Sequence, residues 1–560
     1  MRVIPFLLQV CLMAHLHCRA ATPSLPPSVI VYSATGGGFA AALAAARAGA
    51  AVTLVGATGG GGTGDHIGGM ATGGLQHADC GNATVIGGIA REFFMRVELQ
   101  YPNRSTDPNL KPCTGPPCWL YEAHVAERVM YDMLSEARVR VVTGQEGVAS
   151  VSVTARRVTQ LTTVAGRVFD GDVFIDGSYE GDLLAAAGAT MTFGREAAAQ
   201  YGEAGAGVQP LISYDQLPQG IDPYWPSGEL LPLITTPDAF APLGSADSML
   251  ESYSYRLCMT RAPSRRIPIA KPAGYNASTF ELLRRYITTK NGTTRGDFLY
   301  CLGPIPSLNT SDCPPDDGSE RWCKCDMISG GALGTDFVGA SWEWVNASIT
   351  ERRAIAQAHA EYVTGVVWFL SHDAAVPAPV RADMADYGLC SDEFADTSPP
   401  YFPHQLYVRE ARRLVGDFVL TQNPPPAAIA ARSIGLGSYA FDTHGVQRGV
   451  HANPVTGCPE VVNEGEIAGQ AHHLNPPYVI PYDTLLPARA ELTNVLAAVP
   501  VSASHVAFSS LRMEPTWMIM GHAAGAAAEM AGRTSAGAVH DIDVAALQAA
   551  LVAAGQLIVA

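Results

Sequence analysis

The chain has 560 residues, of which 48% are hydrophobic and 16% are charged, and it carries a formal net charge of −16. This composition is typical of globular proteins and excludes a disordered chain. The length is sufficient for several domains. The negative charge argues against nucleic acid or an anionic membrane as a partner, but it is compatible with a local basic pocket for an anionic substrate.

Residues 1–20 have the pattern of a secretory signal peptide: Arg2, a short apolar core over 4–14, and small residues at the end. The apolar core is too short to span a bilayer, which disfavours an N-terminal membrane anchor. Asn-x-Ser/Thr motifs for glycosylation begin at Asn82, Asn103, Asn276, Asn291, Asn309 and Asn346. We therefore expect a secreted, extracellular glycoprotein with no transmembrane segment.

An even number of cysteines follows this signal, namely Cys80, Cys113, Cys118, Cys258, Cys301, Cys313, Cys323, Cys325, Cys390 and Cys458. Disulfide bonds are the usual state of cysteines in an oxidising compartment. Metal ligation by Cys313, Cys323 and Cys325 is the alternative, but their spacing is not that of a metal site. We therefore expect disulfides and no metal.

The stretch VIVYSATGGGFAAALAAARA, residues 29–48, has the pattern that opens a dinucleotide-binding fold. A β-branched strand at 29–31 leads into a Gly-rich turn at 33–38, a helix of small residues at 39–48 and a second strand at 51–55. Such a turn lets backbone N–H groups approach a pyrophosphate, and the helix N-terminus favours the same anion. An ordinary buried strand–helix unit is the alternative.

Further elements follow in order. A Gly-rich loop covers 59–64, and Gly68, Gly69 and Met70 come next. Helices are expected at 86–100 and 121–137, strands at 139–143 and 147–153, and a hairpin that pairs 160–164 with 167–170. The strand in VFIDGSYEGD ends at Asp176 and precedes a helix at 183–187, so Asp176 could hold ribose or ribityl hydroxyls. Capping of that helix is its alternative role.

Residues 196–430 are rich in Pro, Asn, Asp and Cys, and we interpret them as a second domain inserted into the first. Arg409, Arg412 and Arg413 lie within five residues there, which suggests a clamp for a carboxylate or polar substrate. Surface ion pairs with Glu410 and Asp417 are the alternative.

The last part returns to a buried pattern, with a strand at 494–499, His505, Arg512 and a small-residue helix at 517–530 in which Pro515 suits the first turn. Residues 544–560 are apolar and uncharged. We expect a terminal helix that starts at Asp541 or Asp543 and ends at Gly555, and consider a GPI-type tail unlikely by comparison.

These segments together resemble the FAD-dependent oxidoreductases with a glutathione-reductase-like FAD domain, in their secreted or periplasmic branch. The resemblance is carried by the stretch at 29–50, HIGGMATGGLQHADCGN, VFIDGSYEGDLLAAAGA, HQLYVREARRLVGDFVLTQ and VSASHVAFSSLRMEPTWMIMGHAAGAAA. It implies an α/β fold: a discontinuous Rossmann-like FAD-binding domain at 28–195 and 431–535, an inserted α+β substrate domain at 196–430, and a C-terminal helix within 536–560.

The resemblance also implies FAD as the cofactor and assigns residues to it by position. These are Ser33, Thr35, Gly37 and Gly38 at the pyrophosphate; Gly68, Gly69 and Met70 along the flavin; Val148 at the adenine; Asp176, Gly181 and Asp182 near the strand end; and Arg512, Met513, Glu514 and Pro515 before the helix that faces the flavin. Two residues depart from the family pattern: Gly56 replaces the ribose-binding acid and Ser33 replaces the first glycine.

We therefore predict hydride transfer from a small polar or anionic substrate to FAD, which oxygen or another acceptor reoxidises. His505 is the candidate general base or substrate partner, with packing as its alternative role, and Arg512 is the second catalytic candidate, with an ion pair to Glu514 as the alternative. Arg409, Arg412 and His444 are candidate substrate ligands. A covalent flavin on His66 or His77 is a lesser possibility, and the rival function is a non-catalytic extracellular binding protein. The oligomeric state is left open.

Overall fold

The computed structural model describes residues 25–62, 65–101, 117, 119–211, 215–237, 240–290, 293–306, 323–467, 476–534 and 536–559. The signal predicted at 1–20 lies outside these residues, as do Cys113, Cys118 and Cys313 and the glycosylation motifs at Asn103, Asn291 and Asn309. In the described part of the chain, no helix is long and apolar enough to cross a membrane.

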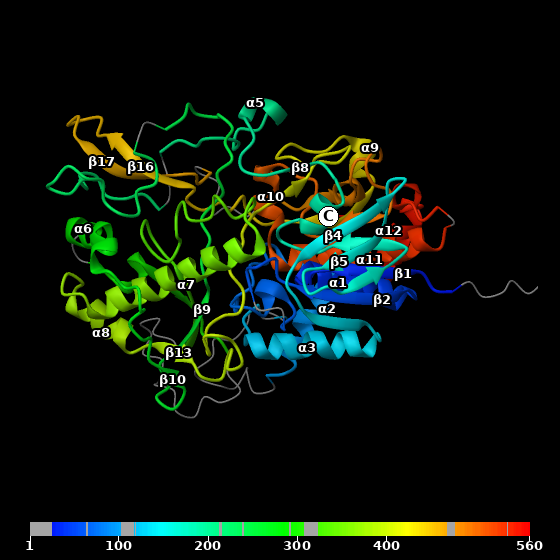
Figure 1. The fold of residues 1–560 in the computed structure, drawn as a ribbon, viewed down its shortest axis with the longest axis horizontal. Helices are drawn as coiled ribbons and strands as arrows, with labels where there is room; N and C mark the ends of the chain where they lie inside the picture. Colours follow the sequence, from blue (N-terminus) through cyan, green and yellow to red (C-terminus); the bar gives the residue numbers. More distant parts are fainter. Residues whose placement is uncertain are drawn as a thin grey trace, which may run out of the picture.

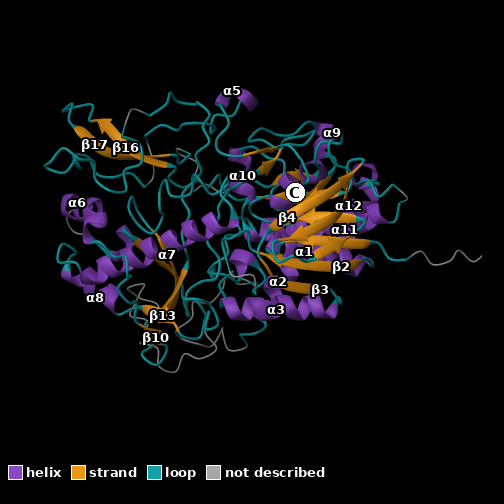
Figure 2. Ribbon diagram, viewed as in Figure 1, coloured by secondary structure: helices purple, strands orange, loops and turns teal. Residues whose placement is uncertain are grey.

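Helices and strands are distributed over the whole described chain, with runs of strands at β3 to β7 (140–176) and β15 to β19 (433–497) (Figures 1 and 2). The α-helices are α1 Gly36–Ala48, α2 Gly88–Glu98, α3 Ala123–Glu136, α4 Asp182–Ala186, α5 Ala198–Tyr201, α6 Glu281–Lys290, α7 Ile349–His372, α8 Ala378–Ala385, α9 Ala427–Ala430, α10 His505–Leu511, α11 Glu514–Gly532 and α12 Val544–Ala553.

The strands are β1 Ser28–Tyr32, β2 Ala51–Ala57, β3 Arg140–Gln145, β4 Val148–Thr154, β5 Arg157–Thr163, β6 Val168–Asp170, β7 Val173–Asp176, β8 Met191–Thr192, β9 Leu257–Thr260, β10 Arg266–Ile267, β11 Leu299–Leu302, β12 Lys324–Ser329, β13 Gly388–Cys390, β14 Arg413–Leu414, β15 Ser433–Gly437, β16 Gln447–Ala452, β17 Pro459–Glu464, β18 Tyr478–Pro481 and β19 Val495–Ala497. Short 3₁₀ turns connect several of them.

A parallel five-stranded sheet in the order β19-β7-β1-β2-β3 forms the centre of one half of the molecule. Val29 in β1 pairs with Val52 in β2 on one side and with Val173 in β7 on the other. Strand β19 comes more than 300 residues after β7 in the chain and still pairs with it, so the sheet is built from two distant parts of the sequence. This arrangement confirms the predicted α/β, Rossmann-like fold class.

Helices α1 and α11 pack against each other at very short range, because glycines replace side chains at the contact. A Cβ at Gly521 would overlap the carbonyl of Gly37, and one at Gly525 would overlap the carbonyl of Ala41. Gly49 ends α1 in the left-handed conformation, with φ +108°, and its N–H bonds to carbonyls of the last turn. The N-termini of α1 and α11 are therefore held side by side.

The other half of the molecule is built on an antiparallel sheet in the order β10-β13-β9-β12-β11. Two disulfides join neighbouring strands of this sheet, Cys258–Cys390 between β9 and β13 and Cys301–Cys325 between β11 and β12. Cys323 is disulfide-bonded as well, whereas Cys80 and Cys458 are free thiols. Disulfide formation is thus confirmed for Cys323 and Cys325, the two described residues of the suspected metal trio.

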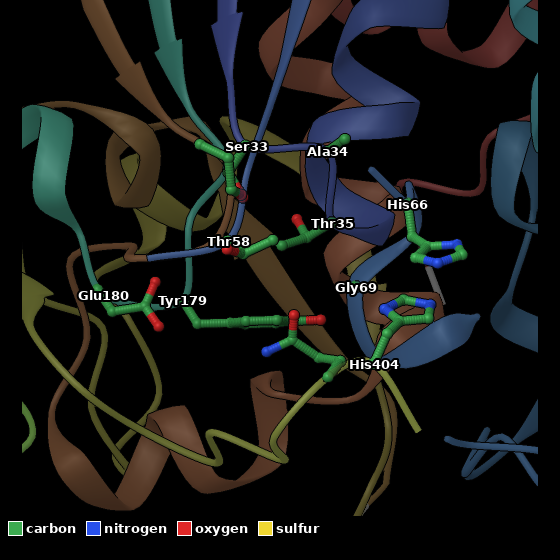
Figure 3. A pocket seen from close by; sticks show the side chains of 11 residues that line it. Ser33, Ala34, Thr35, Thr58, His66, Gly69, Tyr179, Glu180 and His404 are labelled. Atoms are coloured by element: carbon green, nitrogen blue, oxygen red, sulfur yellow. The ribbon is translucent and has the colours of Figure 1, made fainter. Parts of the chain in front are cut away.

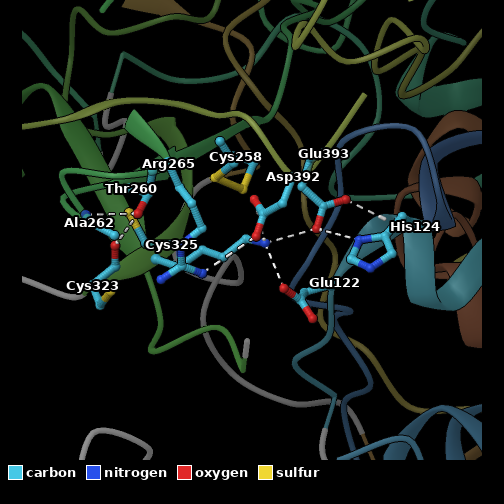
Figure 4. The surroundings of a disulfide bond; sticks show 12 residues. Glu122, His124, Cys258, Thr260, Ala262, Arg265, Cys323, Cys325, Asp392 and Glu393 are labelled. Atoms are coloured by element: carbon cyan, nitrogen blue, oxygen red, sulfur yellow. Dashed lines mark hydrogen bonds and ion pairs between the residues drawn. A yellow bond between two sulfur atoms is a disulfide. The ribbon is translucent and has the colours of Figure 1, made fainter. Parts of the chain in front are cut away.

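A buried lysine connects the two halves through carboxylates, and Figure 4 shows three of these, Glu122, Asp392 and Glu393. Lys324 Nζ in β12 lies 2.7 Å from Glu122 Oε1, just before α3, and 2.9 Å from Glu393 Oε1. Glu393 also accepts a hydrogen bond from the backbone N–H of His124 in α3, at 3.0 Å. The antiparallel sheet is therefore fixed to the parallel half through charges that solvent does not reach.

Strands β16 and β17 lie beside the inserted stretch and far from the parallel sheet, at the upper left of Figure 1. Gly449 in β16 forms a bridge with Thr236. The boundaries predicted for the domains, at 195/196 and 430/431, stay predictions. At the C-terminus, Asp543 caps α12 through its side chain, as expected for the terminal helix.

Candidate cofactor and active site

Three hydrogen bonds of the Ser33 and Thr35 side chains hold the Gly-rich turn between β1 and α1 in place. Ser33 adopts a left-handed conformation, with φ +71°, and its hydroxyl donates to the carbonyl of Ala57 at 2.8 Å. Thr35 caps α1 by accepting from the N–H of Gly38, and its hydroxyl donates to the carbonyl of Gly177 at 2.6 Å. A Cβ at Gly38 would overlap the carbonyl of Ser33, so only glycine fits there.

The loop with Gly68, Gly69 and Met70 lies directly against this turn. The N–H of Gly68 donates to the carbonyl of Ala34 at 2.5 Å. The N–H of Met70 donates to the hydroxyl of Tyr179 at 2.9 Å. The predicted pyrophosphate turn and the predicted flavin loop are therefore neighbours in space.

Glu514 joins this loop to the start of α11. Its Oε1 accepts from the Tyr179 hydroxyl at 2.9 Å, and its Oε2 is buried without a hydrogen-bond partner beside Gly36 at the start of α1. Burial raises the pKa of Glu514 to about 8. The carboxyl group thus lies where two helix N-termini converge, with Pro515 following it in the first turn of α11.

A cavity opens between the turn, the end of β2 and the inserted segment (Figure 3). Its enclosed volume is only about 10 Å³, which is room for about one water molecule. The residues that line it are Ser33, Ala34, Thr35, Ala57, Thr58, His66, Gly69, Tyr179, Glu180, His404 and Gln405. Both halves of the molecule therefore contribute to its wall.

Two histidines stack at one end of this cavity (Figure 3). The rings of His66 and His404 lie 4.2 Å apart and only 9° from parallel, and His66 Nδ1 lies 3.2 Å from both carboxylate oxygens of Glu127. Metal ligation uses lone pairs in the ring planes, so two parallel rings cannot direct theirs to one ion. Both nitrogens of His404 are buried without a partner, and burial holds its pKa well below the ordinary value.

The residues predicted near the end of β7 have different surroundings. Asp176 uses both carboxylate oxygens within its own loop, accepting from Ser178 and from the N–H of Leu184. Asp182 forms ion pairs with Arg352 at 2.7 Å and Arg412 at 2.9 Å. Gly181 has a left-handed φ of +67° before α4. Val148 opens β4 and is half-buried. Their contacts with a cofactor stay predictions.

His505 lies in a buried charge network at the start of α10. Its Nδ1 lies 2.8 Å from Glu410 Oε2, and Glu410 also pairs with Arg413. Burial alone lowers the pKa of His505, but attraction and hydrogen bonding to Glu410 raise it above the ordinary value. A ring that donates from Nδ1 to Glu410 is held in a fixed orientation whether or not Nε2 also carries a proton, so the role of His505 as general base or substrate partner stays a prediction.

Arg512 is also buried, and its partners come from the inserted half and the segment around 442. It donates to the carbonyl of Asp442 at 2.8 Å, to the Asp442 carboxylate at 3.1 Å and to the Tyr407 hydroxyl at 3.1 Å. The alternative of an ion pair with Glu514 is wrong, because Arg512 is paired with Asp442. Burial lowers the pKa of Arg512, but Glu251 and Asp442 raise it overall.

Arg409 and His444 meet at one carboxylate, whereas Arg412 lies elsewhere. Arg409 Nη2 and His444 Nδ1 lie 3.0 and 2.8 Å from the two oxygens of Asp336. Arg412 belongs to the Asp182 cluster beside the cofactor cavity. The expected ion pair with Glu410 does form at Arg413, but it is buried and not at the surface. Arg409 is also buried and pairs with Asp336 instead.

Several residues at the site escaped the sequence analysis. Tyr179 and Glu180 stand inside the motif quoted around Asp176, but neither was given a role. His404 directly precedes the arginine-rich segment. Arg352 enters from α7, a 24-residue helix that was not predicted. The only sequence signal for these residues was that a polar residue stands next to a Gly-rich segment. This signal does not reveal which distant element of the chain packs against the site.

A profile of the family described as FAD dependent oxidoreductase matches residues 28–551. No curated protein matches the sequence. Among solved structures, the chain is similar to the Diels-Alderase PyrE3 of pyrroindomycin biosynthesis, with 17% identity over 30% of this chain and 36% of that chain and a TM-score of 0.20.

It is also similar to OxyS anhydrotetracycline hydroxylase from Streptomyces rimosus, with 13% identity over 30% of this chain and 35% of that chain and a TM-score of 0.21. For GidA from Aquifex aeolicus the identity is 14%, the coverage 36% and 37%, and the TM-score 0.22. The chain spans little more than a third of the length of these structures.

Proposed function

The chain belongs to the family of FAD-dependent oxidoreductases, and from this premise we propose that it oxidises a small polar or anionic organic molecule by hydride transfer to FAD, with oxygen or another acceptor taking the electrons. The family match over residues 28–551 is the observation that carries this proposal. The substrate class and the acceptor are inferred from the groups described above.

The residues of the cavity fit an FAD. The turn at Ser33 and Thr35 places the N-terminus of a 13-residue helix at the cavity wall, which suits a pyrophosphate. Buried polar atoms without partners lie around it, on Glu180, His404 and Glu514, and such atoms are costly unless a ligand satisfies them. FAD is larger than the present space, so we expect the contact between Gly68 and Ala34 to open when it binds.

When bound, FAD supplies the acceptor for the hydride, and the protein supplies position and charge. The turn around Thr35 would hold the pyrophosphate, and Gly69 and Met70 would lie along the flavin. The N-terminus of α11 directs its partial positive charge to the same place. Arg512 stands two residues before Glu514 in the chain and belongs to the buried charge network with Asp442 and Tyr407.

The preference for a polar or anionic substrate is supported by the accessible edge of that network. The side chains of His444 and Asp442 are 25% and 24% exposed, while Arg512 and His505 behind them are buried. A substrate that reaches this edge meets the imidazole of His444 and the carboxylate of Asp442. His505 would donate a hydrogen bond to the substrate there, while the Glu410 carboxylate stabilises the proton on its ring.

Reduction of the bound FAD by candidate substrates tests this function. Under anaerobic conditions the holoprotein is mixed with sugars, hydroxy acids and amino acids, and loss of flavin absorbance is followed. We expect at least one class to bleach the flavin, and His505→Ala to slow the bleaching while FAD stays bound. An unchanged rate in that variant would remove His505 from the mechanism.

Secretion is the second part of the proposal. It is supported by the signal-like residues 1–20 and by the exposure of Asn276 and Asn346. When the full chain is expressed in a eukaryotic secretory host, we expect it in the medium, with a mass that an endoglycosidase lowers. Retention of an unglycosylated chain inside the cell would contradict this part and leave the redox function unaffected.

A further inference from the structure

The acid that usually holds the adenosine ribose at the end of the second strand is missing from this chain. In dinucleotide-binding folds a carboxylate at that position accepts hydrogen bonds from the ribose hydroxyls. Here Gly56 occupies the position near the end of β2, and Ala57 and Thr58 follow in the cavity wall. A bound FAD therefore needs a carboxylate from another element at this place.

Among the described residues that line the cavity, Glu180 is the only acid. It follows β7, and its carboxylate lies against the loop that leaves β2: a Cβ at Gly59 would overlap both of its oxygens. Figure 3 shows Glu180 at one edge of the cavity beside Tyr179, with its carboxylate turned inward. In the sheet β1 separates β7 from β2, so Glu180 reaches past β1 to the loop that follows Gly56.

The carboxylate of Glu180 is also unsatisfied. The residue is 1% exposed, and its Oε1 has no hydrogen-bond partner. The nearby guanidinium of Arg352 is directed to Asp182 and to the carbonyl of Gly59, so it attracts Glu180 without bonding it. Burial raises the pKa of Glu180 to about 7, against the opposing charge of Arg352. The Trp344 side chain and the backbone of Glu180 also favour the charged carboxylate, but a buried oxygen without a partner is costly unless a donor reaches it.

We propose that Glu180 replaces the acid missing at Gly56 and accepts hydrogen bonds from the vicinal hydroxyls of the adenosine ribose of FAD. This inference rests on the proposed function, because it requires FAD as the cofactor. It explains why the family's ribose-binding acid can be lost while the cofactor is kept. It also assigns a ligand to the unpartnered oxygen of Glu180.

The test measures FAD affinity of the mature chain after removal of cofactor, by quenching of flavin fluorescence. Glu180→Gln keeps the shape of the side chain and removes its charge. A hydrogen bond to a charged group contributes about 1.5–3 kcal/mol, so we expect FAD to bind roughly 10- to 100-fold more weakly. FMN lacks the adenosine, and its affinity should stay the same.

Gly56→Glu provides a rescue. Gly56 has no left-handed φ, and a Cβ there would lie 3.4 Å from Thr143 Cα, an ordinary contact, so a side chain is tolerated. In the Glu180→Gln background, Gly56→Glu should recover most of the lost FAD affinity. Glu203→Gln is the matched control, since Glu203 is also buried with one unpartnered oxygen but lies outside the cavity wall. It should leave FAD affinity unchanged.

Three results would overturn the inference: an FAD affinity of Glu180→Gln within twofold of the wild type, an equal loss for FMN and FAD, or a loss that Gly56→Glu does not reduce. If Glu180→Gln does not fold, Glu180→Asp keeps the charge, and it should give a smaller loss that the same substitution rescues. A wild-type chain that binds no FAD would instead refute the proposed function. The two failures are therefore distinguishable.

Discussion

Ser33 occupies a backbone conformation that favours glycine, and its hydroxyl compensates by bonding to the carbonyl of Ala57. A left-handed conformation costs a residue with a Cβ about 1–2 kcal/mol. A buried hydrogen bond contributes about 1 kcal/mol. The two terms nearly cancel, which is how the turn keeps its shape although the family's first glycine is replaced.

This balance gives a prediction for two variants of Ser33. Ser33→Ala keeps the backbone cost and loses the hydrogen bond, so it should lower the free energy of unfolding by about 1–2 kcal/mol. Ser33→Gly loses the bond and also the backbone cost, so its stability should be within about 0.5 kcal/mol of the wild type. Chemical denaturation measures both. A larger loss for Ser33→Gly than for Ser33→Ala would contradict this balance.

His505 should make stability depend on pH in a defined direction. The pKa of His505 is raised in the folded chain from an ordinary value of 6.5. Its protonation therefore contributes fully to the free energy of unfolding below pH 6.5, and this contribution declines as the pH rises through the pKa of the folded state. Replacement by Gln removes one partner of a buried pair and should cost about 3 kcal/mol at low pH and less above it.

His522 is the opposite control for this measurement. Burial lowers its pKa to about 4, so the unfolded chain binds its proton first and the wild type loses stability between pH 6.5 and 4. The difference between wild type and His522→Gln should therefore change with pH in the opposite direction. Equal pH dependence for the two variants would refute the charged pair at His505.

At the scale of elements, the close contact of α1 and α11 is the feature on which the cofactor site depends. Gly521→Ala would place a methyl group on the carbonyl of Gly37. Because backbone atoms leave little room to adjust, we expect a loss of about 3 kcal/mol in stability. The helix N-termini would also separate, and FAD affinity should fall.

Thermal unfolding and FAD titration of the Gly521→Ala variant measure these two effects. Ala526→Ser is the matched control, since Ala526 lies on the same helix and is half-buried away from that contact. It should change stability by less than about 0.5 kcal/mol. Normal stability and normal FAD affinity in Gly521→Ala would show that the helices can move apart without consequence.

The buried Lys324 contributes at the same scale, by holding α3 and β12 together (Figure 4). Burial alone raises the pKa of Glu393, but Lys324 and His124 lower it to about 2 from 4.5. The ionised Glu393 carboxylate therefore contributes fully to the free energy of unfolding above pH 4.5, and this contribution is lost as the pH falls toward 2. Lys324→Met should cost about 3–5 kcal/mol at neutral pH.

The pH dependence distinguishes this ion cluster from simple packing. The difference in unfolding free energy between wild type and Lys324→Met should shrink as the pH falls below 4.5, because protonated carboxyl groups no longer need the lysine. A difference that stays constant down to pH 3 would show that the methylene chain of Lys324, and not its charge, holds the two elements together.

The sequence predicted the parallel half of the molecule well, and it did so for a physical reason. Strands β1 and β2 and helix α1 are neighbours in sequence, and hydrophobic periodicity with glycine at the turns is enough to define them. The antiparallel half was not resolved into elements. Strand β9 pairs with β12 and β13, which lie 60 to 130 residues away in the sequence. A pattern of neighbouring residues cannot predict pairing over such distances.

The same limit applies to the site. The residues of the turn at Ser33 and Thr35 were found because they are consecutive. The partners of Arg409 and Arg512 were not found, because Asp336 and Asp442 belong to distant segments. Nor could the sequence reveal that Glu180 reaches the loop after β2, since that contact depends on the order of strands in the sheet.

At the scale of the whole molecule, two halves enclose one cavity. The parallel half supplies the turn at Ser33 and Thr35, and the other half supplies His404 and Gln405. Redox chemistry by a bound flavin benefits from such an arrangement, because the second half shields the cofactor from water and brings polar groups to its edge. The proposed redox function and the role proposed for Glu180 both depend on FAD in that cavity.

The visible absorbance spectrum of the purified mature chain, expressed from Ala21 in a secretory host, tests this dependence most directly. We expect the absorbance bands of a flavin, and release of FAD on acid or heat treatment, with stoichiometric recovery of the bands when FAD is added back. A folded, colourless chain that does not bind added FAD would contradict the account. It would show that the family's fold serves extracellular binding here without the cofactor.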